Sequence, residues 1–175
     1  RPRPLVCESA GRMSQSYFTK ADTFRRSGAL PSPWIASDMK FVPDSSVVSE
    51  VIPSANYGDR RNNRAADMIV LHYTGMPDAE SAVQRLTKAG TEVSSHYIVH
   101  EDGRIIQCVP ESLRAWHAGA GSWDKDSDIN SCSIGIEIVN GGHDHGLPPF
   151  PLRQIAAVSA LCKGIAIRRN ISPDR

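Results

Sequence analysis

A short apolar run at residues 68–74, Met-Ile-Val-Leu-His-Tyr-Thr, most narrows the folds open to this chain. It is rich in β-forming residues and ends in a turn that contains Gly75 and Pro77, so it predicts a buried β-strand. Alternation along the strand places His72 on one face, near the carboxyl end. An imidazole there is either a metal ligand or acid–base group, or a core histidine that hydrogen-bonds a neighbour.

A second core strand is predicted at residues 133–139, Ser-Ile-Gly-Ile-Glu-Ile-Val. Its three isoleucines would cover one face, and Glu137 would lie on the other. Burying an unpaired carboxylate is costly, or the group stays protonated. Glu137 is therefore expected either to be paired within the fold or to act as a general acid or base.

The segments around these strands predict an α/β fold in which helices flank a mixed central β-sheet. One helix should begin at Asp78 and end before Gly90, and another should cover residues 152–168. Between them, residues 95–100 and 104–109 predict the two strands of a β-hairpin.

A chain of 175 residues predicts one folded domain. Residues 1–38 repeat Pro, Ser and Arg without a hydrophobic period, so they are expected to form a poorly ordered tail, with the domain at 39–175. The formal net charge of +1 predicts no nucleic-acid partner, and no apolar run is long enough to span a membrane. A monomer is expected.

Cysteine usage and the start of the chain bear on its location. The four cysteines are widely spaced and favour free thiols over a disulfide framework or a cysteine-type zinc site. No signal peptide is visible, which favours a cytoplasmic location, with the periplasm or cell envelope as the alternative.

Four segments occur in order: Ile-Val-Leu-His-Tyr-Thr at 69–74, Ser-His-Tyr-Ile-Val at 95–99, Ala-Trp-His-Ala-Gly at 115–119 and Ser-Ile-Gly-Ile-Glu-Ile-Val-Asn at 133–140. Together they resemble the zinc-dependent N-acetylmuramoyl-L-alanine amidases of the amidase-2 type, a family that includes peptidoglycan recognition proteins. The resemblance implies a mixed sheet with a zinc cleft on one side. It also implies hydrolysis of the amide between N-acetylmuramic acid and L-alanine in peptidoglycan or muropeptides.

The resemblance assigns roles to single residues. His72 matches the first zinc-binding histidine, and Glu137 matches the catalytic glutamate. Trp116, His117 and Asn140 are expected to contact the peptidoglycan substrate. Zinc in a hydrolase keeps three protein ligands and one open position for water, and a nearby carboxylate can take that water's proton.

The family's other two zinc ligands follow the last helix, in a region that should begin just after Arg175. The domain is therefore expected to be C-terminally incomplete or a degenerate member, and to bind zinc weakly. The competing hypothesis is a module that binds muropeptide without cleaving it. Among the other histidines, a packed core position is expected for His96, an exposed turn edge for His100, and a solvated loop for His143 and His145.

Overall fold

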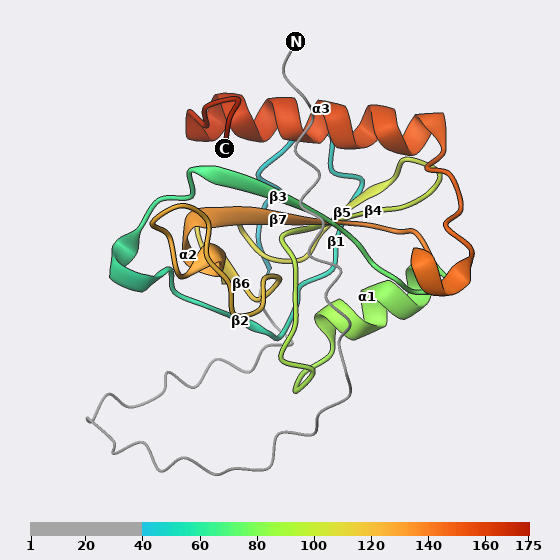
Figure 1. Ribbon diagram of the computed structural model, residues 1–175, viewed down its shortest axis with the longest axis horizontal. Helices are drawn as coiled ribbons and strands as arrows, with labels where there is room; N and C mark the ends of the chain where they lie inside the picture. The colour runs from blue at the N-terminus through green and yellow to red at the C-terminus, as the bar shows by residue number, and fades with distance from the viewer. Residues whose placement is uncertain (1–39) are drawn as a thin grey trace. The chain divides into compact units, whose positions relative to one another are not determined.

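The computed structural model describes residues 40–175, so the tail expected at residues 1–38 lies outside the described part of the chain. Its centre is a five-stranded sheet with the order β1-β5-β4-β7-β3 (Figure 1). In that order the strands are β1 Glu50–Val51, β5 Ile105–Gln107, β4 Tyr97–Val99, β7 Ser133–Ile138 and β3 Met68–Tyr73. Strands β4 and β5 pair antiparallel and the other neighbours pair parallel, so the predicted mixed sheet is confirmed.

Strand β3 lies at the edge of this sheet, which corrects the prediction of a buried core strand. Within residues 40–175 it pairs only with β7. Leu71 and Tyr73 are consequently 49% and 40% exposed, although Met68 at the start of the strand is buried. The apolar composition of the run could not distinguish an edge strand from a central one.

Two helices cover opposite faces of the sheet (Figure 1). Helix α1, Ala79–Thr87, begins where the Asp78 side chain accepts a hydrogen bond of 2.7 Å from the Ser81 amide, as its capping role predicted. Helix α3, Leu152–Arg169, ends at Asn170, which adopts the left-handed conformation with φ of 53°. None of the described helices is long and apolar enough to cross a membrane.

The two faces have separate cores. On the α3 face, Tyr97 and Ile136 pack with Leu161 and Ile165 of the helix. On the α1 face, Ile98 belongs to the cluster that contains Ala82 and Leu86. Sheet register pairs Ile98 with Glu137, and paired neighbours point to the same side, so Glu137 lies on the α1 face.

Smaller elements connect these layers. A separate two-stranded ribbon pairs β2, Tyr57–Gly58, with β6, Arg114–Ala115. A short helix, α2 at Ile129–Cys132, leads directly into β7. Two 3-10 turns complete the described part, at Arg61–Asn63 and His143–His145.

The burial of the remaining histidines tests their predicted positions. His96 is fully buried, and His143 and His145 are exposed, as predicted. His100 is only 8% exposed, so its predicted place at an exposed turn edge is wrong. The first turn of α3 covers this hairpin, since a Cβ added at Gly103 would lie 3.1 Å from the Arg153 carbonyl oxygen.

Candidate active site

Parallel pairing of β3 with β7 brings the two principal sequence candidates together. His72 is the register partner of Glu137, so both side chains leave the sheet on the α1 face. His72 is half-buried near the carboxyl end of β3. Their common side of the sheet agrees with the single zinc cleft that the family resemblance implies for these two residues.

The Glu137 carboxyl group is held without a partner. Its Oε2 atom is buried and has no hydrogen bond within the described part of the chain. Burial raises the pKa of Glu137 to about 7. A carboxyl group with this pKa exists in both protonation states at neutral pH, which is the property that general acid–base chemistry requires.

His117 joins this pair from the loop between β6 and α2. Its Nδ1 atom lies 3.0 Å from Nε2 of His72, and its Nε2 atom lies 3.1 Å from the Ser133 hydroxyl. The ring packs directly over Gly135, where an added Cβ would approach the His117 Cγ to 2.3 Å. Gly135 is therefore needed because a side chain there would displace the imidazole.

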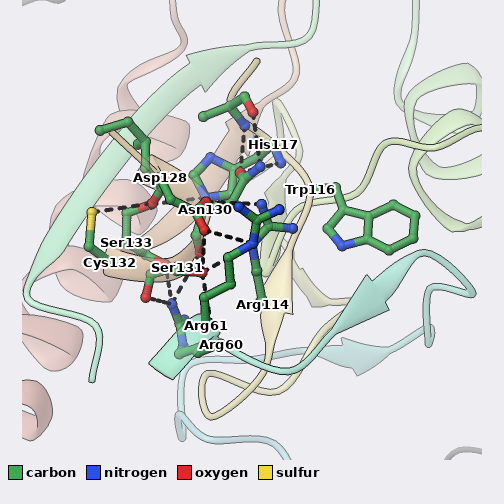
Figure 2. A network of polar contacts seen from close by, with 12 residues as sticks. Arg60, Arg61, Arg114, Trp116, His117, Asp128, Asn130, Ser131, Cys132 and Ser133 are labelled. Carbon is green, nitrogen blue, oxygen red and sulfur yellow. Dashed lines mark hydrogen bonds and ion pairs between the residues drawn. The ribbon is translucent and has the colours of Figure 1, made fainter. Parts of the chain in front are cut away.

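Asn130 fixes the backbone of the loop that carries His117 (Figure 2). Its Oδ1 accepts from the amides of His117 and Ala118 at 3.0 and 2.8 Å, and its Nδ2 donates to the Ala118 carbonyl at 2.9 Å. Sequence reasoning missed this residue. Its partners lie 12 and 13 residues away, and no local motif marks an asparagine in α2 as a loop clamp.

The other two predicted substrate contacts, Trp116 and Asn140, differ in whether their polar side-chain atoms are already hydrogen-bonded. The Trp116 side chain is half-buried and points away from the polar network of Figure 2, and its indole N–H has no partner among residues 40–175. Asn140 is buried, and both polar atoms of its side chain serve the adjoining loop. Its Nδ2 donates to the Pro148 carbonyl and its Oδ1 accepts from the Gly142 amide.

Arg60 is buried and holds several backbone carbonyl groups in place. Its guanidinium donates to the carbonyl oxygens of Glu111, Asn130, Ser131 and Ser133 at 3.0 to 3.3 Å. Burial lowers the pKa of Arg60 to about 10, so it stays cationic at neutral pH. Nothing in the sequence distinguished Arg60 from its neighbours Arg61 and Arg64.

His96 is the core histidine that the sequence predicted. Its Nδ1 accepts from the Gly135 amide at 3.0 Å, so its Nε2 carries the proton and donates to the Leu113 carbonyl at 3.1 Å. Both nitrogens are thereby engaged within the fold. The neutral ring supports β7 next to His117 without facing a ligand.

In a Glu137→Gln background, we expect the folded chain to lose stability as the pH falls from 7 to 5. Burial lowers the pKa of His96 from 6.5 to about 3, so below pH 6.5 the unfolded chain takes up a proton that the folded chain does not. At pH 5 this difference lowers the free energy of unfolding by about 2 kcal/mol. Urea unfolding at the two pH values measures the loss.

Two neighbouring groups modify this dependence. Burial also lowers the pKa of His117 well below 6.5, which adds to the loss. The raised pKa of Glu137 opposes the loss by about 2 kcal/mol between pH 7 and pH 5, because there the folded state binds the proton more tightly, so in wild type it offsets the contribution of His96. A Glu137→Gln background removes the opposing contribution. Ring NMR provides the direct check, and a His96 that titrates near pH 6.5 would contradict the assignment.

The donor set around His72 fits part of a zinc site. Burial lowers the pKa of His72, which favours the neutral imidazole that a metal binds. However, within residues 40–175 no third His, Cys, Asp or Glu ligand atom lies within 4.8 Å of both His72 Nε2 and His117 Nδ1. A hydrolytic zinc site needs three protein ligands, so the described residues do not complete one.

A second cluster satisfies the distance requirement for a metal site but not the chemistry. Ligand atoms of Asp67, Asp126 and Cys132 lie within 4.8 Å of one another. Both carboxylates are already paired with Arg64 and Arg175, and Arg175 Nη2 lies 2.9 Å from Asp67 and 2.8 Å from Asp126. Hydrogen bonds from the two arginines hold the pKa of Asp126 well below its usual range. This cluster is therefore an ion-pair network.

Comparison with known proteins agrees with this architecture. A family model described as N-acetylmuramoyl-L-alanine amidase matches residues 62–175. The N-acetylmuramoyl-L-alanine amidase AmiD of Escherichia coli K12 is 37% identical over 131 residues, a match that covers 66% of this chain and 46% of AmiD. The 1,6-anhydro-N-acetylmuramyl-L-alanine amidase AmpD of Salmonella typhimurium is 28% identical over 161 residues, covering 77% of this chain and 86% of AmpD.

Solved structures support the same fold. AmiD in complex with anhydro-N-acetylmuramic acid-L-Ala-D-γ-Glu-L-Lys superposes with a TM-score of 0.57 at 38% identity, covering 62% of this chain and 46% of that one. A crystal structure of AmpD gives a TM-score of 0.62 at 24% identity, covering 75% of this chain and 86% of that one, and it shows likeness of fold alone. This chain thus spans less than half the length of AmiD.

Proposed function

Since this chain belongs to the N-acetylmuramoyl-L-alanine amidase family, we propose that it hydrolyses the amide bond between N-acetylmuramic acid and L-alanine in peptidoglycan or in muropeptides. The observation that carries the proposal is the pair formed by His72 and the unpartnered Glu137 on one face of the sheet. The printed names of AmpD and of the AmiD complex refer to anhydro-muramyl compounds, which supports a muropeptide as the substrate to test.

In this proposal Glu137 moves the proton. As a carboxylate it takes a proton from the water whose oxygen attacks the carbonyl carbon of the lactyl group. The carbon–nitrogen bond then breaks, and protonated Glu137 delivers the proton to the departing amine of L-alanine. A pKa of about 7 suits both directions of transfer at neutral pH.

We further propose that the reaction is zinc-dependent and that His72 is one of the ligands. Bound zinc would lower the pKa of its water to about 7 and polarise the scissile carbonyl. Trp116 is the proposed substrate contact on the adjoining loop, because its ring is directed away from the polar network and its N–H is free within the described part. His117 and Asn140 remain weaker candidates for contact, since their polar atoms are occupied.

A second candidate function is a module that holds muropeptide without cleaving it. The observation in its favour is the donor set, because residues 40–175 supply at most two imidazoles where three ligands are needed. For the same reason we expect the 175-residue chain to bind zinc weakly. Stoichiometric zinc in elemental analysis of the purified chain would contradict that expectation.

Incubation with anhydro-N-acetylmuramic acid-L-Ala-D-γ-Glu-L-Lys in the presence of zinc distinguishes the two functions. The amidase releases a peptide with a free L-alanine amine, and a chelator stops the release. Saturable binding with no released peptide selects the module instead. Cytoplasmic location and a monomeric state remain predictions, which cell fractionation and sedimentation can measure.

A further inference from the structure

A single file of hydrogen bonds runs from His72 into the protein. His72 Nε2 lies 3.0 Å from His117 Nδ1, and His117 Nε2 lies 3.1 Å from the hydroxyl of Ser133. The Ser133 hydroxyl in turn lies 2.5 Å from the carbonyl oxygen of Ile129. The file therefore ends on an atom that can only accept.

The end of the file determines where each proton resides. A backbone carbonyl has no proton, so the Ser133 hydroxyl donates to Ile129. Having used its one proton, the hydroxyl oxygen must accept from Nε2–H of His117. A neutral imidazole carries one N–H, so His117 Nδ1 is a lone pair that accepts from Nε2–H of His72.

The reverse order of protons is disfavoured by the same distances. It would require the Ser133 hydroxyl to donate to His117 Nε2 and would leave two unprotonated oxygens, those of Ser133 and Ile129, 2.5 Å apart. Two acceptors at that separation repel each other. The geometry thus selects one direction along the file.

The file cannot easily rearrange, because the middle ring is held on several sides. Gly135 leaves no space between the ring and β7, since a Cβ at that position would lie within 2.6 Å of three His117 ring atoms. Asn130 accepts from the His117 amide and so fixes the backbone behind the ring (Figure 2). Ser133 is fully buried, so water does not compete for its hydroxyl.

At the outer end, His72 Nδ1 is left as a lone pair that meets solvent. It has no hydrogen-bond partner among the described residues, and it is not among their buried unpartnered atoms. We propose that His117 and Ser133 are positioning residues, which hold His72 with its proton on Nε2 and present its Nδ1 lone pair to solvent on the α1 face of the sheet. Metal-binding histidines commonly have their second nitrogen oriented in this way by a hydrogen bond.

The order of the protons is inferred independently of the proposed function, whereas the role of the His72 Nδ1 lone pair in binding zinc rests on that function. NMR of the full chain with 15N-labelled histidine at pH 7, without metal, tests the order directly. We expect N–H protons on Nε2 of both His72 and His117, and a scalar coupling across the hydrogen bond between His72 Nε2 and His117 Nδ1. His72 protonated on Nδ1, or no coupling in wild type, would overturn the proposal.

Variants separate positioning from folding. His117→Phe keeps a ring over Gly135 but removes the acceptor, so the coupling should vanish while the remaining spectrum is kept. Ser133→Ala should leave His117 Nε2–H without its acceptor and speed its exchange with water, whereas the exposed Ser112→Ala serves as the matched control. Unchanged exchange in Ser133→Ala would exclude Ser133 from the file.

A zinc titration distinguishes this proposal from the proposed function. If His72 binds zinc through Nδ1, that nitrogen shifts and the coupling to His117 survives, and both variants should weaken binding by about 10- to 100-fold. Loss of the coupling with shifts at His117 Nδ1 would show that His117 is itself a ligand and overturn its positioning role. If zinc leaves the His72 nitrogen signals unshifted and the coupling to His117 intact, His72 is not a zinc ligand, but the inferred proton order still holds.

Discussion

Replacing Glu137 with glutamine is expected to lower the rate of muropeptide hydrolysis by at least about 100-fold, because general acid–base groups typically contribute 10²- to 10⁴-fold. Glutamine has nearly the same shape but cannot carry a proton between water and amine. Release of peptide from anhydro-N-acetylmuramic acid-L-Ala-D-γ-Glu-L-Lys measures the change. Glu80→Gln on the exposed side of α1 is the matched control and should retain full activity.

The same variant is expected to be more stable than wild type at alkaline pH. Burial raises the pKa of Glu137 from 4.5 to about 7, so ionising it in the folded state costs free energy once the pH exceeds 4.5. The cost grows to a limit of about 3 kcal/mol above pH 7 and is absent below pH 4.5. Urea unfolding at pH 8 and pH 4 should therefore show a gain for Glu137→Gln only at pH 8.

These two results together separate a catalytic residue from a structural one. A structural acid would lose stability and activity together on replacement. Full activity in the glutamine variant would remove Glu137 from the mechanism, and equal stability of variant and wild type at pH 8 would show that its carboxylate is not desolvated.

Replacing Glu111 with alanine is expected to lower the free energy of unfolding by about 3 kcal/mol or more, as for other broken buried ion pairs. Glu111 is 1% exposed and accepts from Arg168, Arg169 and the Tyr97 hydroxyl, each at 2.7 Å. Burial alone would raise the pKa of Glu111, but these hydrogen bonds outweigh it and the pKa is lowered. The residue connects the end of α3 to the sheet.

Urea unfolding at pH 7 measures this loss, with Glu80→Ala as the exposed control. Alanine leaves the Tyr97 hydroxyl buried without its acceptor, whereas the two half-exposed arginines can turn towards water. The loss should therefore lie near the lower end of the range for buried pairs. A change below about 1 kcal/mol would show that Glu111 contributes no more than an exposed ion pair.

The sequence predicted the features that depend on local pattern. The strands with His72 and Glu137, the Asp78 cap and the last helix all follow from spacing within a few residues, and the structure confirms them. That His72 and Glu137 share a face was an expectation from the family resemblance, and the parallel register of β3 with β7 agrees with it. Their roles in catalysis remain proposals.

What the sequence could not predict depends on contacts between distant segments. Arg60 reaches carbonyl groups 51 to 73 residues away, and Asn130 clamps a loop that it meets only in the folded chain. The edge position of β3 and the burial of His100 likewise depend on which elements pack together. Local composition carries no signal for such partners.

Gly135 also constrains how the sheet can assemble. If β7 paired with β3 one residue out of step, every side chain of β7 would change sides. Ile134 or Ile136 would then stand beneath His117, in space that only a residue without a side chain leaves open, and Glu137 would point into the α3 core. A chain with this shifted register therefore has no room for the His117 ring. The contact between His117 and Gly135 thus helps to build the site and also disfavours the wrong register of β3 and β7.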